Sequence, residues 1–203
     1  MMGRMTPVVR VLLLANLGVF AAQFVLGQNA FAPLMLWPWH GDPAEGGLPF
    51  QPWQVLSYGF LHFEFWHLFA NMFGLFMFGP DIERLLGSAR FGVYYLTCVA
   101  GAALAQLFVT ATIYPSPYPT VGASGGLFGL LLCYGMAFPH RRLLLLFPPI
   151  PMPAWLFVTL YGLVELYFGV TATSQGVAHF AHLGGMAAGY LLLRYWRATA
   201  RRQ

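Results

Sequence analysis

The chain of 203 residues is 59% apolar and only 8% charged, with a mean hydropathy of +0.65. This composition excludes an ordinary soluble globule and predicts a polytopic membrane protein. The net charge of +4 depends on ten basic residues, all of them arginine, whose positions carry information about orientation. Cys98 and Cys133 lie in apolar runs, which indicates small buried thiols and no disulfide framework.

Six apolar segments have the length, or nearly the length, of a transmembrane helix, which needs about 20 residues. We predict one all-α membrane domain over residues 1–203. Its helices should cover 8–26, 56–78, 91–113, 123–138, 153–170 and 177–196, with a basic cytoplasmic tail at 197–203. The second helix begins at either Leu56 or Phe65. The first segment resembles a signal peptide, but no small-residue cleavage site follows Leu26, so we expect a retained helix.

The connections differ in character. Residues 27–52 combine Gly and Pro with several aromatic side chains, and the tryptophans indicate an anchor at the headgroup level. Gly79 and Pro80 should end the second helix in a polar turn at 81–90. Three further connections are predicted as loops: 114–120, 143–152 and 171–176, the last being small and polar enough for a mobile cap.

The arginines set the orientation of this arrangement. They precede the first helix, join helices two and three, join helices four and five, and follow the sixth: Arg4, Arg10, Arg84, Arg90, Arg141, Arg142, Arg194, Arg197, Arg201 and Arg202. All ten therefore fall on one side of a six-span protein. By the positive-inside rule that side is cytoplasmic, so both termini should face the cytoplasm.

The segment Pro119 to Gly129, read PTVGASGGLFG, places Ser124 among four glycines at the start of the fourth helix. Polar side chains at membrane depth are costly and tend to pair or to act in function. The predicted helix has only about 16 residues before Pro139, fewer than a full span requires. Ser124 should therefore lie near the outer face but below the membrane surface.

The sixth helix contains AHFAHLGGMAAGY, in which His179 and His182 precede Gly185 and Gly189. Small residues at this spacing let two helix backbones approach closely. Glycine-lined fourth and sixth helices could thus bring the Ser124 hydroxyl and an imidazole into hydrogen-bond contact, as an activated serine requires. The alternative is that these glycines, serine and histidines only hold helices together.

On the second helix, His67 and Asn71 stand at positions i and i+4 on one face, at the depth expected for Ser124. Side chains of these types, with a backbone N–H at the start of a helix, can stabilise the negative oxygen that develops in acyl transfer. A polar pair that merely bridges two helices is the alternative.

Three motifs in this order resemble the rhomboid intramembrane serine proteases: HLFAN at His67–Asn71, GASG at Gly122–Gly125 and AHLGG at Ala181–Gly185. The resemblance covers nearly the whole chain and implies the six-helix bacterial form. It implies Ser124 as nucleophile and His182 as general base of a dyad without an aspartate. It further implies an oxyanion hole of His67, Asn71 and the Ser124 N–H. The supporting residues would be Gly122, Gly125, Phe128, Gly185 and Gly189, and segment 79–87 would be the cytoplasmic turn.

Two positions depart from this family's pattern. Trp53 is followed by Gln54 where the family often has arginine, so the anchoring of the preceding loop should differ. Phe128 stands where a tyrosine often stacks on the catalytic histidine, so stacking should survive and any role of a phenol hydroxyl is lost.

Two other polar groups invite different readings. His62, Glu64 and His67 form H-x-E-x-x-H, but a metalloprotease helix needs H-E-x-x-H, so a zinc site is the weaker hypothesis and His62 should support the loop or the oxyanion site. Glu165 lies roughly 7 to 8 Å from the outer end of the fifth helix at 1.5 Å per residue. Solvation near the interface or a contact with a gate or substrate would explain it.

The sequence thus predicts a serine endopeptidase that cleaves transmembrane segments of membrane proteins near the outer face of the bilayer. We expect no cofactor, no metal and no nucleic-acid partner, and a multi-pass location in the bacterial inner membrane. By family analogy, helix five and the loop 171–176 would gate substrate entry. The oligomeric state stays open. A catalytically silent relative that escorts membrane proteins is one alternative, and a small transporter or channel is another.

Overall fold

The computed structural model describes residues 5–39, 47–144, 150–171 and 178–200. The longer helices are α1 (Pro7–Leu26), α3 (Phe65–Leu86), α4 (Ser88–Thr112), α5 (Ser124–Ala137), α6 (Ala154–Thr171) and α7 (His179–Ala200). The short elements are the 3-10 helices η1 (Gln28–Leu34) and η3 (Tyr58–Phe60), helix α2 (Gln54–Ser57), and the antiparallel pair β1 (Arg142–Leu144) and β2 (Pro151–Pro153). The predicted helical class is therefore correct, and the small strand pair overlaps both ends of the predicted connector 143–152, extending one residue beyond it on each side.

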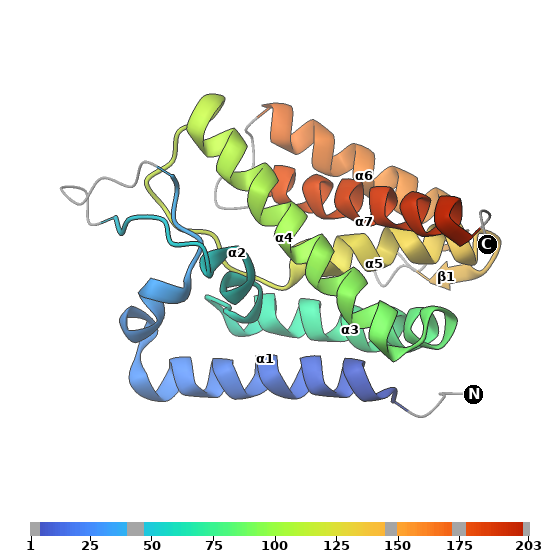
Figure 1. The fold of residues 1–203 in the computed structure, drawn as a ribbon, viewed down its shortest axis with the longest axis horizontal. Coiled ribbons are helices and arrows are strands. Elements are labelled where there is room, and N and C mark those ends of the chain that lie inside the picture. Colours follow the sequence, from blue (N-terminus) through green and yellow to red (C-terminus); the bar gives the residue numbers. More distant parts are fainter. Residues whose placement is uncertain (1–4, 40–46, 145–149, 172–177, 201–203) are drawn as a thin grey trace.

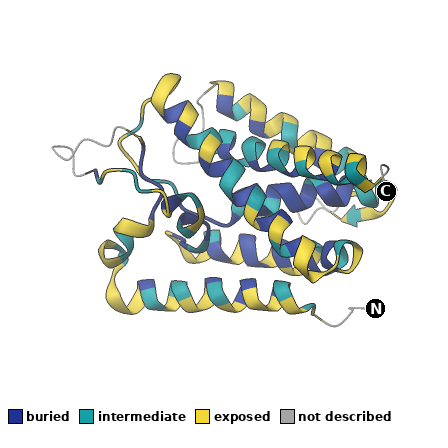
Figure 2. Cartoon of the chain, in the orientation of Figure 1, coloured by how far each residue is buried: buried dark blue, intermediate teal, exposed yellow. Residues whose placement is uncertain are grey.

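The helices form a bundle in which α4 runs diagonally across α5 and α7 and packs on both (Figure 1). Helix α1 packs against α3 at one side of the bundle, and α6 packs against α5 and α7 at the opposite side. Helix α5 is the most enclosed of these, whereas α1 and α6 turn many exposed residues outward (Figure 2). An apolar exposed surface on the outer helices is what a lipid environment requires.

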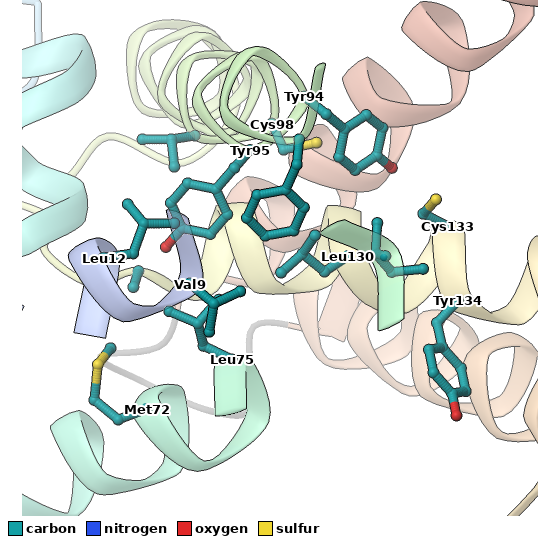
Figure 3. Packing of buried hydrophobic residues seen from close by; sticks show 14 of the residues in the cluster. Val9, Leu12, Met72, Leu75, Tyr94, Tyr95, Cys98, Leu130, Cys133 and Tyr134 are labelled. Atoms are coloured by element: carbon teal, nitrogen blue, oxygen red, sulfur yellow. The ribbon is translucent and has the colours of Figure 1, made fainter. Parts of the chain in front are cut away.

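The core is formed by α1, α3, α4 and α5 (Figure 3). Tyr94, Tyr95 and Cys98 of α4 meet Leu130 and Cys133 of α5, and all five side chains are almost fully buried. Both cysteines are free thiols, so they act here as small apolar side chains. This core fixes the position of α5, and with it the start of that helix.

Three helices in the described part of the chain, α1, α4 and α6, are long and apolar enough to cross a membrane, and α5 is a shorter apolar helix. At 1.5 Å per residue, its 14 residues span about 21 Å, less than the roughly 30 Å of a hydrocarbon core. Near its start, Gly125 packs on Ala102, ten residues before the end of α4 at Thr112, or about 15 Å along α4. The start of α5 is therefore recessed relative to the end of α4. The count of six spans stays a prediction.

The predicted end of the second helix at Gly79 and Pro80 is wrong, because α3 continues through both residues to Leu86. The expected polar turn is reduced to Gly87, whose φ of 79° is readily adopted only by glycine. Gly79 serves close packing instead, since a Cβ there would lie 2.7 Å from Cγ2 of Val9 on α1.

The extra turns of α3 carry Glu83 to the N-terminus of α1. The Glu83 carboxylate accepts hydrogen bonds from the backbone N–H groups of Val8 (3.0 Å) and Val9 (2.9 Å) and from the Ser88 hydroxyl (2.6 Å). The first N–H groups of a helix have no acceptor within that helix, and a negative charge there is favourable. Glu83 therefore ties α1 to the α3–α4 junction.

The aromatic segment before α3 is packed, as expected for a segment so rich in rings. Leu36 pairs with Thr120 in an antiparallel bridge, and the Trp37 indole donates to the Ala32 carbonyl at 2.7 Å. Gln54 is 1% exposed, and its side chain accepts from the Trp37 N–H and donates to the Pro33 carbonyl. At the position where the family often has arginine, a buried amide thus anchors this loop.

The start of α1, the α3–α4 junction, β1 and the end of α7 lie at one end of the bundle (Figure 1). The described arginines belong to these segments, whereas the aromatic segment lies at the other end. Helix α7 extends to Ala200, so the basic residue Arg197 is helical and not part of a tail that begins at 197. Most of the predicted cap at 171–176 lies outside the described residues.

Candidate active site

Ser124 is the first residue of α5, so its N–H lacks an acceptor within the helix. The preceding turn depends on Gly122, whose φ of 128° is a conformation that other residues rarely adopt. The side chain of Ser124 is partly buried. The sequence GAS therefore presents a hydroxyl and a backbone N–H from the same residue, at a recessed helix start.

His182 on α7 reaches this hydroxyl. Its Nε2 lies 2.8 Å from Oγ of Ser124, a hydrogen-bond distance. The ring stacks on Phe128, with centroids 4.1 Å apart and planes at 6°, and Phe128 stacks in turn on Tyr161 of α6 at 5.2 Å. Phe128 is about one turn after Ser124 on α5, so one helix supplies both the hydroxyl and the aromatic surface that orients the imidazole.

The close approach of α5 and α7 depends on glycine. A Cβ at Gly185 would overlap the carbonyl oxygen of Gly125, so these two backbones touch directly. Gly189 differs from the expectation: a Cβ there would overlap the Tyr94 hydroxyl and lie 2.9 Å from Sγ of Cys98, both on α4. The predicted two-helix contact is therefore a three-helix contact, because α4 fills the space behind both glycine faces.

His67 and Asn71 approach the site from α3. A Cβ at Gly122 would lie 2.6 Å from Nε2 of His67 and 3.7 Å from Oγ of Ser124, so the ring and the hydroxyl border the same space. Asn71 is 4% exposed, and its Nδ2 donates to the His67 carbonyl at 2.9 Å. That amide carries a second hydrogen. The structure thus places the His67 ring beside Ser124 and sets Asn71 one turn further along α3.

Glu165 is the residue that sequence reasoning misjudged. It is 7% exposed, which excludes solvation at the interface as its explanation. Its Oε2 lies 2.8 Å from Nδ1 of His182 and 2.7 Å from Nδ1 of His179. His182 therefore has an acidic partner, although the resemblance implied a dyad lacking an aspartate. A lone carboxyl group in an apolar span was the available signal.

These three residues form the one group of potential metal ligands found in the described part of the chain, with ligand atoms within 4.8 Å of one another. Their distances are those of hydrogen bonds, which account for the arrangement without an ion. The H-x-E-x-x-H segment forms no such group there, because Glu64 is exposed while His62 is fully buried.

His62 supports the neighbouring His67. Its ring meets that of His67 edge-on, with centroids 4.9 Å apart. Its backbone N–H donates to the Gln23 side chain at 3.1 Å, and its carbonyl accepts from Gln28 at 3.3 Å. Within the described residues, neither ring nitrogen of His62 has a hydrogen-bond partner. The expectation that His62 supports the loop before α3 therefore agrees with its contacts to α1 and η1.

Several known proteins that are similar to this chain carry the name rhomboid. A family model for the rhomboid domain matches residues 49–198. Rhomboid protein 1, mitochondrial, of Saccharomyces cerevisiae is 33% identical over 145 residues, which cover 68% of this chain and 40% of that protein. Rhomboid protease GluP of Bacillus subtilis is 30% identical over 141 residues (68% and 25%), and rhomboid protease GlpG of Serratia proteamaculans is 26% identical over 181 residues (88% and 58%). The chain spans less than two thirds of the length of these relatives.

Proposed function

The chain belongs to the rhomboid family, and on that premise we propose that it is a serine endopeptidase that cleaves transmembrane segments of membrane proteins. The observation that carries the proposal is the 2.8 Å contact between Nε2 of His182 and Oγ of Ser124. A serine hydroxyl is a weak nucleophile until a neighbouring base accepts its proton, and this contact supplies the base.

In the proposed reaction, Oγ of Ser124 bonds to the carbonyl carbon of the scissile peptide while its proton passes to Nε2 of His182. The carbonyl electron pair moves to oxygen, and the His67 ring, the Asn71 amide and the Ser124 N–H are suited to stabilise that oxyanion. The imidazolium then gives its proton to the departing amine as the C–N bond breaks. Water repeats these steps on the acyl-enzyme. No cofactor takes part in this scheme.

The proposed setting follows from the arginine pattern and the recessed start of α5. Six spans with the arginine-bearing end in the cytoplasm place Ser124 towards the outer face of the membrane, which we take to be a bacterial inner membrane. Substrates would be single transmembrane segments that unwind easily near that face, because a peptide bond inside a regular helix is shielded from attack. Helix α6 and the following loop would gate their entry.

The test is cleavage of a model transmembrane substrate by the purified chain. We expect Ser124→Ala and His182→Ala each to lower the rate by at least about 10⁴-fold. Ser116→Ala and His140→Ala change the same residue types outside the site and should retain activity. Labelling by a serine-directed fluorophosphonate should require Ser124. Equal cleavage by the wild type and both site variants would refute the proposal, and an unlabelled, inactive wild type would favour a silent escort protein.

A further inference from the structure

The contacts of Glu165 call for a physical explanation. A carboxylate removed from water costs several kcal/mol unless it is paired and hydrogen-bonded. Glu165 is buried in an otherwise apolar helix, yet a single oxygen, Oε2, lies within 2.8 Å of two imidazole nitrogens. The two histidines stand three residues apart on α7, so both rings reach the carboxylate from the same helix face.

These contacts decide which nitrogen of His182 carries the proton. An ionised carboxylate only accepts hydrogen bonds, so Nδ1 of His182 must donate to Glu165. In a neutral imidazole the other nitrogen then holds a lone pair. That nitrogen, Nε2, is the one 2.8 Å from Oγ of Ser124. The hydroxyl therefore donates to Nε2, which is the arrangement that a general base needs before attack.

We propose that Glu165 is a positioning residue that holds His182 in this tautomer and orientation and stabilises the imidazolium that forms when Ser124 attacks. The site is then a Ser–His–Glu triad, in which the carboxylate stays ionised and Nε2 receives the proton of Ser124 only during the attack. The inference rests on the proposed function and concerns how the base is prepared.

His179, on the same face of α7, makes the second contact with the carboxylate. Its Nδ1 donates to the same Oε2 at 2.7 Å, and its ring tilts against Phe168 of α6 at 5.7 Å between centroids. Two donors on one oxygen stabilise the ionised carboxylate and restrict its rotation. The role of His179 is thus to hold Glu165, which in turn holds His182.

The first test separates turnover from binding in the full chain. Glu165→Gln keeps the shape of the side chain but removes the charge. We expect kcat for a model transmembrane substrate to fall on the order of 10³-fold, with KM changed by less than about threefold. Glu165→Asp restores the carboxylate and should recover part of the lost kcat. The exposed Glu64→Gln is the matched control and should retain wild-type kcat.

The second test needs no variant of Glu165 that folds. In protein with ¹⁵N-labelled histidine, the His182 signals are identified by their absence from His182→Ala. Their shifts should report a protonated Nδ1 and an unprotonated Nε2. A proton on Nε2 overturns the inference, as does full kcat in Glu165→Gln. Cleavage that Ser124→Ala abolishes and Glu165→Gln leaves intact would refute the role of Glu165 alone, whereas cleavage unaffected by Ser124→Ala would refute the proposed function.

Discussion

Gly185→Ala is a minimal change that should disable the candidate site without touching a reacting group. A Cβ at Gly185 would overlap the Gly125 carbonyl oxygen and lie 2.9 Å from its carbonyl carbon and 3.2 Å from its Cα. These are backbone atoms of α5, which cannot turn aside as the end of a flexible side chain can. Carbon atoms pack at about 3.5 to 4.0 Å, and the overlap with the oxygen is tighter still, so α5 and α7 must separate by at least about 1 Å.

That separation acts on the contact between Ser124 and His182. Ser124 directly precedes Gly125, and His182 is one turn before Gly185, so the 2.8 Å distance between Oγ and Nε2 lengthens with the helix spacing. A misplacement of about 1 Å can lower an enzymatic rate about 10²-fold. Overpacking of this kind also destabilises a protein by roughly 1 to 3 kcal/mol. We expect Gly185→Ala to cleave about 10²-fold more slowly and to unfold at lower temperature.

Single-turnover cleavage of a model transmembrane substrate measures this effect, with thermal unfolding in the same detergent as the stability measurement. Two glycines serve as controls: a Cβ at Gly162 would meet only the Met186 side chain at 3.6 Å or more, and one at Gly18 would meet nothing within 4 Å. Both alanine variants should cleave at the wild-type rate. If Gly185→Ala is as fast as Gly18→Ala, close backbone contact does not set the geometry of the site.

Two further changes test other parts of the structure. Burial opposes ionisation of Glu83, but the hydrogen bonds from Ser88 and from the α1 backbone outweigh it and lower the pKa of Glu83. Its contribution is therefore present above the unfolded carboxyl pKa and lost as pH falls through the folded one. Glu83→Gln should lower stability at neutral pH by roughly 1 to 3 kcal/mol and flatten the decline of Tm on acidification, and parallel Tm–pH curves would contradict this. Phe128→Leu removes the ring stacked on His182, a contact worth about 0.5 to 1.5 kcal/mol, and should lower kcat up to about 10-fold, whereas Phe128→Tyr should keep wild-type activity; equal kcat for both would show that stacking does not position His182.

The contact between Ser124 and His182 could be predicted because the residues that permit it lie close to each of them in the sequence. Gly122, two residues before Ser124, allows the positive φ of the turn. The glycines near Ser124 and His182 let the two helices approach, and these glycines are visible as short sequence patterns. The contact of His182 with Glu165 could not be predicted in this way. Apart from Glu165, the long side chains of α6 are apolar on every side, so its sequence does not indicate that the face with Glu165 meets His182 on α7.

The length of α3 could not be predicted from its own sequence. Gly79 and Pro80 together are a common signal for the end of a helix, and locally nothing opposes that interpretation. In the fold, Gly79 admits Val9 of α1, and the turns beyond Pro80 bring Glu83 to the amides of that helix. The hydrogen bonds that stabilise the continued helix come from a segment more than 70 residues away, so no local sequence pattern indicates them.

Helix α6 holds Glu165 against His182 and Tyr161 against Phe128. The helix proposed as the gate therefore also helps to position His182. A hydrogen bond is lost within a few tenths of an ångström beyond its normal range, far less than the width of an incoming helix. An α6 that swings outward therefore releases the base as it admits a substrate. If α6 is the gate, the proposed protease would be inactive while α6 is open, and the catalytic geometry would return only after α6 has closed over the substrate.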